Sequence, residues 1–130
     1  MGLLSVIIAA IGGFAFGAVW YMTLAKQWVA AVGIETDENG RPVNDDPKLY
    51  VISFVAMIVV AGMMRHTFAM AGIDGFGKGL ISGLGIGLFF ISPWIMINNA
   101  YGDRPFKLTV IDSGYAAFGC GVMGAILGLF

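Results

Sequence analysis

The chain is poor in charged and chemically reactive side chains. Only 12% of its 130 residues are charged, whereas soluble domains carry about 25%, and it has one cysteine and one histidine. The single cysteine excludes an internal disulfide and a cysteine-based metal site. The net charge of −1 argues against a nucleic-acid partner, which would need a basic face. Without paired carboxylates or a nucleophile motif, we expect neither an enzyme nor a bound metal or cofactor.

What the chain has instead is apolar sequence, which makes up 58% of its residues. Four long apolar runs are each about as long as a helix must be to cross a bilayer. They cover residues 3–24, 49–70, 79–98 and 108–130. Unpaired backbone groups are not tolerated in lipid, so runs of this length become helices. The sequence therefore predicts one all-α transmembrane domain over residues 1–130, an integral membrane four-helix bundle.

Two local features modify this plan. Leu24, Trp28 and Val32 are four residues apart and share one helix face, which predicts a short interfacial helix over residues 25–33, after the first span. Pro93 lies in the second half of the third span and removes one backbone donor, so we expect a kink there.

The distribution of positive charge indicates an orientation. Four spans place the first and third connections on one side of the membrane and both termini on the other, and positive residues favour the cytoplasmic side. The first side carries Lys26, Arg41, Lys48, Arg104 and Lys107, and the second carries Arg65 and Lys78. We therefore expect a multi-pass protein with the long loop, residues 25–48, in the cytoplasm and both termini outside.

One carboxylate lies inside an apolar run. Asp112 is about one turn into the last span, where an ionisable group is costly and usually has a partner or a task. Tyr115 follows three residues later on the same helix face, and the first and third spans end on the same side. The expected polar cluster consists of Asp112, Tyr21, Asn98 and Tyr115, with Lys107 or Arg104 supplying positive charge. Asp112 then either anchors the start of its helix, the reading that its shallow depth favours, or binds a proton or cation.

Glycines recur four residues apart in three of the spans. This spacing puts two glycines on one helix face and lets a neighbouring backbone approach closely. The predicted packing glycines are Gly13, Gly17, Gly79, Gly83, Gly87, Gly124 and Gly128. The spacing leaves open whether they pack within one chain or between chains.

The pattern resembles a bacterial family known as domain of unknown function 1761. The likeness rests on Trp20-Tyr21 followed by Lys26 and Trp28, on Arg104 and Lys107 leading into Leu108, Ile111, Asp112, Gly114 and Tyr115, and on Gly124 with Gly128. The resemblance implies a small four-span protein of the bacterial inner membrane. It brings no activity, cofactor or catalytic residue with it.

Two functions remain open at this point. The favoured one is a structural or interaction protein, surrounded by membrane lipids, that forms a homo-oligomer or attaches to a larger membrane protein complex. The spaced glycines and the lack of chemical groups support it. The alternative is a small proton- or cation-coupled transporter or channel that uses Asp112.

Overall fold

The computed structural model describes residues 2–33 and 47–130, and the regular elements in these ranges are helices. In chain order they are α1 (Gly2–Thr23), α2 (Ala25–Val32), α3 (Pro47–Ala71), α4 (Phe76–Gly85), the π-helical segment η1 (Ile86–Ile91), α5 (Ser92–Tyr101) and α6 (Phe106–Leu129). The segments α4, η1 and α5 follow one another without a break, so four helices are long and apolar enough to cross a membrane. This confirms the predicted all-α fold, and the short helix α2 stands where one was expected.

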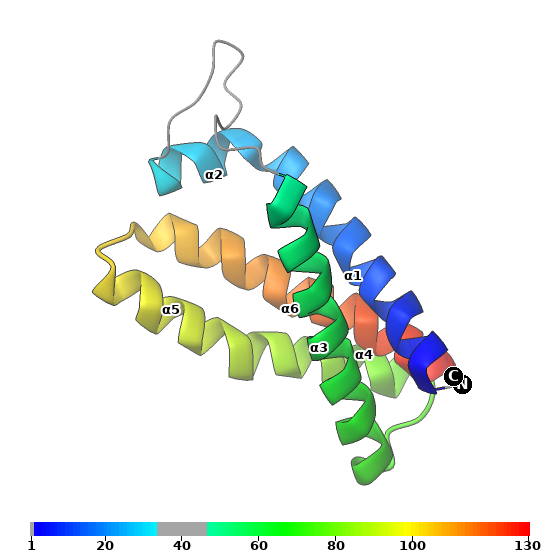
Figure 1. Ribbon diagram of the computed structural model, residues 1–130. Coiled ribbons are helices and arrows are strands. Elements are labelled where there is room, and N and C mark those ends of the chain that lie inside the picture. The colour runs from blue at the N-terminus through cyan, green and yellow to red at the C-terminus, as the bar shows by residue number, and fades with distance from the viewer. Residues whose placement is uncertain (1, 34–46) are drawn as a thin grey trace.

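The two ends of the chain lie close together at one end of the molecule, as four crossings require (Figure 1). The helix α2, the α5–α6 connection and the first turn of α3 lie at the other end, which we call the loop end. The helices share the interior unequally. The buried share of the most apolar stretch of each helix is 50% for α6 and 11% for α3. The last span is therefore the central helix, and α3 is peripheral.

Glycines join the α4–η1–α5 helix to α6 along their length. A Cβ added at Gly83 would overlap the carbonyl oxygen of Cys120, and one at Gly87 would overlap that of Ala116. Nearer the chain ends, Gly79 and Gly124 face each other's backbones in the same way, and Gly128 faces Gly75. The Gly75 amide also donates to the Gly128 carbonyl at 3.0 Å. These five predicted packing glycines thus bring two helices of the same chain together.

The first helix packs between α6 and α3. A Cβ at Gly13 would lie 2.8 Å from the Met123 sulfur, and one at Gly17 would lie 2.7 Å from the Tyr115 ring. These two glycines therefore make room for large side chains from α6. The apolar core beside them is formed by Val6, Ala9, Ala10, Ala61, Met64, Phe68, Cys120, Met123 and Leu127.

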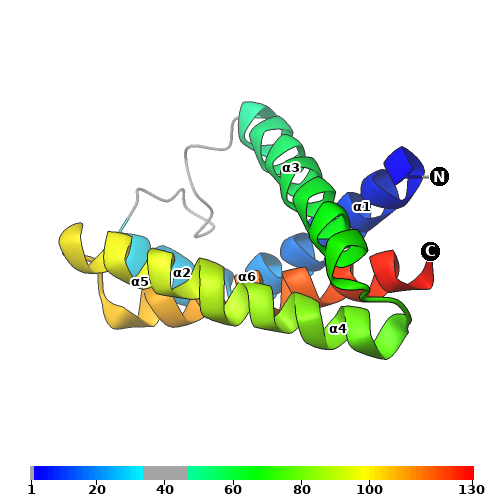
Figure 2. The same ribbon diagram turned by 90° about the horizontal axis from the view of Figure 1, so that it is seen from below.

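The third helix is held mainly by α1. It lies near α4 at its Ala71 end and diverges from the α5–α6 hairpin toward its Pro47 end (Figure 2). Large apolar side chains along it are exposed, namely Val51, Ile52, Val55, Val59 and Met63. In a bilayer such a face meets lipid tails, which are as apolar as leucine, so its exposure alone does not destabilise the fold.

The third span departs from α-helical geometry just before Pro93. Pro93 has no amide proton, so one carbonyl of the preceding turn loses its helical donor. The six residues Ile86–Ile91 before it are π-helical. The Ser92 hydroxyl donates to the Gly87 carbonyl at 2.6 Å, inside the buried part of this turn. Local π adjustment of this kind is one way in which proline is accommodated in a membrane helix.

Candidate functional site

Asp112 is held at the loop end by the last turns of α1. The Tyr21 hydroxyl donates to Oδ1 of Asp112 at 2.7 Å. One residue earlier on each helix, the Trp20 indole Nε1 donates to the Ile111 carbonyl at 2.9 Å. These two adjacent bonds tie α1 to α6 and set the position of the carboxylate.

Aromatic rings surround this carboxylate. The Tyr21 and Tyr115 rings meet edge to face with centroids 5.3 Å apart, and Tyr21 meets Trp28 of α2 edge to face at 6.1 Å. The Tyr115 hydroxyl points toward α3, where it lies 3.6 Å from the Met57 sulfur. Side chains from α1, α2 and α6 thus form an aromatic corner beside Asp112.

The aromatic corner opens into a cavity of about 1220 Å³. Its walls come from α1, α2, α3, the η1–α5 segment and α6. Apolar side chains make up most of two walls. Leu49, Met57 and Val60 belong to the α3 wall, and Ile91 and Ile95 form the wall of the η1–α5 segment. The residues that line the cavity thus come both from α3 and from the α5–α6 hairpin. Figure 2 shows that α3 diverges from this hairpin toward its Pro47 end.

The members of the predicted polar cluster do not all reach Asp112. Tyr21 bonds it and Tyr115 packs on Tyr21, whereas Asn98 and Lys107 are exposed and form no hydrogen bond or ion pair with it. Arg104 donates instead to the Val32 carbonyl at 2.6 Å, which joins the α5–α6 connection to the end of α2. The amide that bonds between spans is Asn99, which lies 3.1 Å from the Thr109 hydroxyl.

Asp112 has no cationic partner within residues 2–33 and 47–130, where its hydrogen bond comes from Tyr21. Within the described part of the chain, the residues that line the cavity include no lysine, arginine or histidine. Those same ranges also hold no group of three or more histidine, cysteine or acidic side chains that could bind a metal. The site therefore offers one carboxylate oxygen beyond the tyrosine bond, aromatic faces and a large apolar space.

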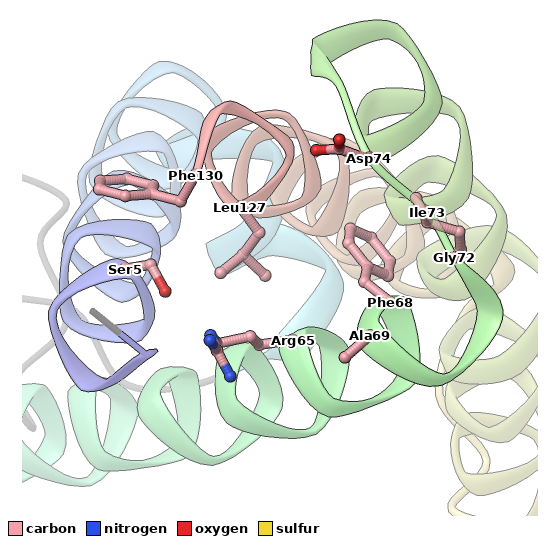
Figure 3. A pocket seen from close by; sticks show the side chains of 9 residues that line it. All are labelled: Ser5, Arg65, Phe68, Ala69, Gly72, Ile73, Asp74, Leu127 and Phe130. Atoms are coloured by element: carbon pink, nitrogen blue, oxygen red, sulfur yellow. The ribbon is translucent and has the colours of Figure 1, made fainter.

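A second hollow of about 290 Å³ lies at the end where the termini meet. Arg65 of α3 points across it toward Ser5 of α1, and Asp74 lies at its far edge (Figure 3). Arg65 is therefore remote from Asp112, on the opposite side of the apolar core, as its place in the sequence implied. The hollow is small, and its arginine is exposed, as expected for a side chain that reaches the membrane surface.

Four apolar spans, of which α6 is the central one, define a multi-pass membrane protein of the helical class. Within that class, a family model described as "Protein of unknown function (DUF1761)" matches residues 4–128, and the chain belongs to this family. The resemblance noted in the sequence is thereby confirmed over nearly the whole chain. Comparisons with curated proteins and with solved structures gave no match.

Two residues of the site were not predicted to belong to it. Met57 is one of several methionines in an apolar span, and nothing marks it as the neighbour of Tyr115. Trp28 was placed on the interfacial helix by its spacing, but its contact with Tyr21 depends on how α2 folds back after Leu24. Both contacts join residues from different helices, which helical periodicity along one segment does not report.

Proposed function

We propose that this protein is a small transporter or channel for a positively charged species, a proton or a cation, with Asp112 as the binding carboxylate. The observation that carries the proposal is the position of Asp112 on the wall of the large cavity, without a cationic partner among the described residues. A carboxylate inside a span is costly unless it is paired, and it marks ion or proton pathways in membrane proteins. A cation entering the cavity would supply the missing partner.

The glycines no longer favour the structural role that the sequence suggested. Gly83 and Gly87 approach the backbone of α6, and Gly13 and Gly17 approach side chains of α6, all in the same chain. These contacts explain how α1 and the α4–η1 segment pack on α6, so the glycine spacing does not require a second protein. The hypothesis of association therefore loses its main support. The hypothesis of transport through Asp112 is strengthened, because Asp112 lines a large cavity.

The test compares ion flux in liposomes that contain the parent protein or the Asp112→Asn variant. Asparagine keeps the shape and one acceptor oxygen for Tyr21 but does not ionise. We expect the parent to dissipate an imposed cation or proton gradient and Asp112→Asn to lose that flux with an unchanged circular dichroism spectrum. Asn98→Leu, at an exposed site of the same end, is the matched control and should conduct normally. A parent without flux, or a folded Asp112→Asn variant with full flux, would contradict the proposal.

Association with a partner is the second candidate, and the position of α3 favours it. This helix contacts mainly α1 and leaves most of its apolar surface to whatever surrounds it. A homo-oligomer or a larger membrane complex would cover that surface. We expect a cysteine placed at Val59 to form disulfide-linked products in native membranes, and one placed at Phe118, exposed on α6, to form none. Equal yields at both sites would count against an interface on α3.

We further propose that the protein lies in the bacterial inner membrane with the loop end in the cytoplasm. The support is charge: Lys26, Lys48, Arg104 and Lys107 belong to the loop end, whereas Lys78 and Arg65 belong to the other. Arg41 also counted toward this assignment and lies outside the described residues. With a membrane-impermeant maleimide, Lys78→Cys should react in intact cells, and Lys107→Cys only after permeabilisation. The reverse pattern would invert the topology.

A further inference from the structure

The size of the cavity and the nature of its walls restrict the kind of cation that suits Asp112. Ligand pockets commonly enclose about 300–1,000 Å³. The cavity beside Asp112 measures about 1220 Å³, far more than a single metal ion occupies. A divalent ion would also need several oxygen ligands, and Asp112 is the one carboxylate among the described residues that line the cavity. The site is built for an organic molecule.

The polar side of the cavity fits a substituted ammonium group. Tyr21, Trp28 and Tyr115 line the same cavity as Asp112, and successive rings meet nearly at right angles, at 80° and 74°. Ring faces attract alkylated ammonium groups, which lose little hydration when they leave water. The oxygen of Asp112 that Tyr21 does not engage adds the opposite charge. Charge and aromatic faces therefore act on the same group.

The remaining walls fit a hydrocarbon chain. From the aromatic corner the cavity extends between α3 and the η1–α5 segment, along Leu49, Met57, Val60, Ile91 and Ile95. None of the described residues that line it is cationic, so a phosphate next to the ammonium group would find no partner among them. This argues against a phospholipid headgroup and in favour of a free amphiphile that carries positive charge alone.

We propose that the cavity binds a single-chain amphiphile with a substituted ammonium headgroup, the headgroup at Asp112 and the chain between α3 and α5. This inference rests on the proposed function, because it names the substrate class for the same carboxylate. It differs from that function in one respect: binding is expected whether or not the ligand is then moved across the membrane.

The probe is radiolabelled dodecyltrimethylammonium, added below its micelle concentration to the protein in lipid nanodiscs, with empty nanodiscs as the blank. We expect saturable binding that unlabelled dodecyltrimethylammonium displaces and dodecyl sulfate of the same chain length does not. Asp112→Asn should weaken binding about tenfold or more, the size of one lost charge-assisted contact. Trp28→Leu should weaken it less, because one ring is lost and the carboxylate stays.

Two further variants keep the test decisive if Asp112→Asn folds poorly. Ile95→Trp adds bulk to the apolar wall and should reduce binding while Asp112 stays in place. Asn98→Leu, exposed and outside the cavity walls, is the control and should bind as the parent does. Equal binding of the sulfate, displacement by phosphatidylethanolamine at equal concentration, or unchanged affinity in a folded Asp112→Asn variant would overturn the inference.

The flux experiment separates this inference from the proposed function. If binding depends on Asp112 but the protein shows no flux, the result supports this inference and contradicts the proposed transport function. Flux that depends on Asp112 without any saturable binding of dodecyltrimethylammonium supports the transporter and overturns the inference.

Discussion

Replacing Gly83 with alanine tests the packing of α4 on α6 with a single methyl group. The added Cβ would overlap the carbonyl oxygen of Cys120 and lie 2.8 Å from its carbonyl carbon and 3.1 Å from the Gly121 Cα. Ordinary contact begins at 3.4 Å, so the carbonyl carbon alone would have to retreat by roughly 0.6 Å. These are backbone atoms of a helix, which cannot rotate away as a side chain does. The two helices must therefore move apart.

The expected cost is that of overpacking a close contact, about 1–3 kcal/mol of unfolding free energy. Gly85 provides a matched control, because it lies two residues further along α4 and a Cβ there meets nothing within 4 Å. Alanine is favoured over glycine in a helix by about 1 kcal/mol at either position, so this gain cancels when the two variants are compared. Gly85→Ala should equal or exceed the parent in stability, and Gly83→Ala should fall below Gly85→Ala by the full overpacking cost.

The assay is reversible unfolding in mixed micelles of a mild detergent and dodecyl sulfate, followed by far-ultraviolet circular dichroism. Both variants should have the helix content of the parent before unfolding. If Gly83→Ala is as stable as Gly85→Ala, the close approach of α4 to α6 does not exist in the folded protein. The same result would mean that the spaced glycines are not covered by α6, and they would then again suggest contact with a partner protein.

Two smaller effects follow from single hydrogen bonds. Trp20→Phe keeps an aromatic ring but loses the bond from Nε1 to the Ile111 carbonyl, so the unfolding free energy should drop by about 0.5–1.5 kcal/mol in the same micelle assay. Ser92→Ala removes the hydroxyl that donates to Gly87 in the π-helical turn and should cost a similar amount, about 0.5–1.5 kcal/mol. If Trp20→Phe loses no stability, the indole does not tie α1 to α6. If Ser92→Ala loses no stability, the turn before Pro93 is held by its backbone alone.

Much of the fold could be predicted because it depends on composition along one segment at a time. The four apolar runs became helices with ends within a few residues of those expected, since the bilayer length and the need to pair backbone groups act on each run separately. The irregularity beside Pro93, which the structure shows as a π-helical turn, and the helix that contains Trp28 were likewise local, because a missing amide proton and a four-residue spacing are properties of residues close in the sequence.

The candidate site was predictable only in part. Asp112 stood out because a carboxylate inside an apolar run is rare, and Tyr21 was placed at the same end by counting spans. Asn98, Lys107 and Arg104 were assigned to the cluster by the same count. They belong to the same end but form no hydrogen bond or ion pair with Asp112, because span counting gives depth along the membrane normal and no angle around each helix.

The sequence by itself determined that this is a four-span helical membrane protein with one carboxylate inside its last apolar run. It did so through hydropathy and length, which need no knowledge of neighbours. Only the tertiary structure decided that Gly83 and Gly87 pack against α6 of the same chain and that α3 diverges from α5 to leave a cavity beside Asp112. Those facts depend on how helices rotate and tilt against one another, and in lipid this is set by close packing between surfaces that hydropathy does not distinguish.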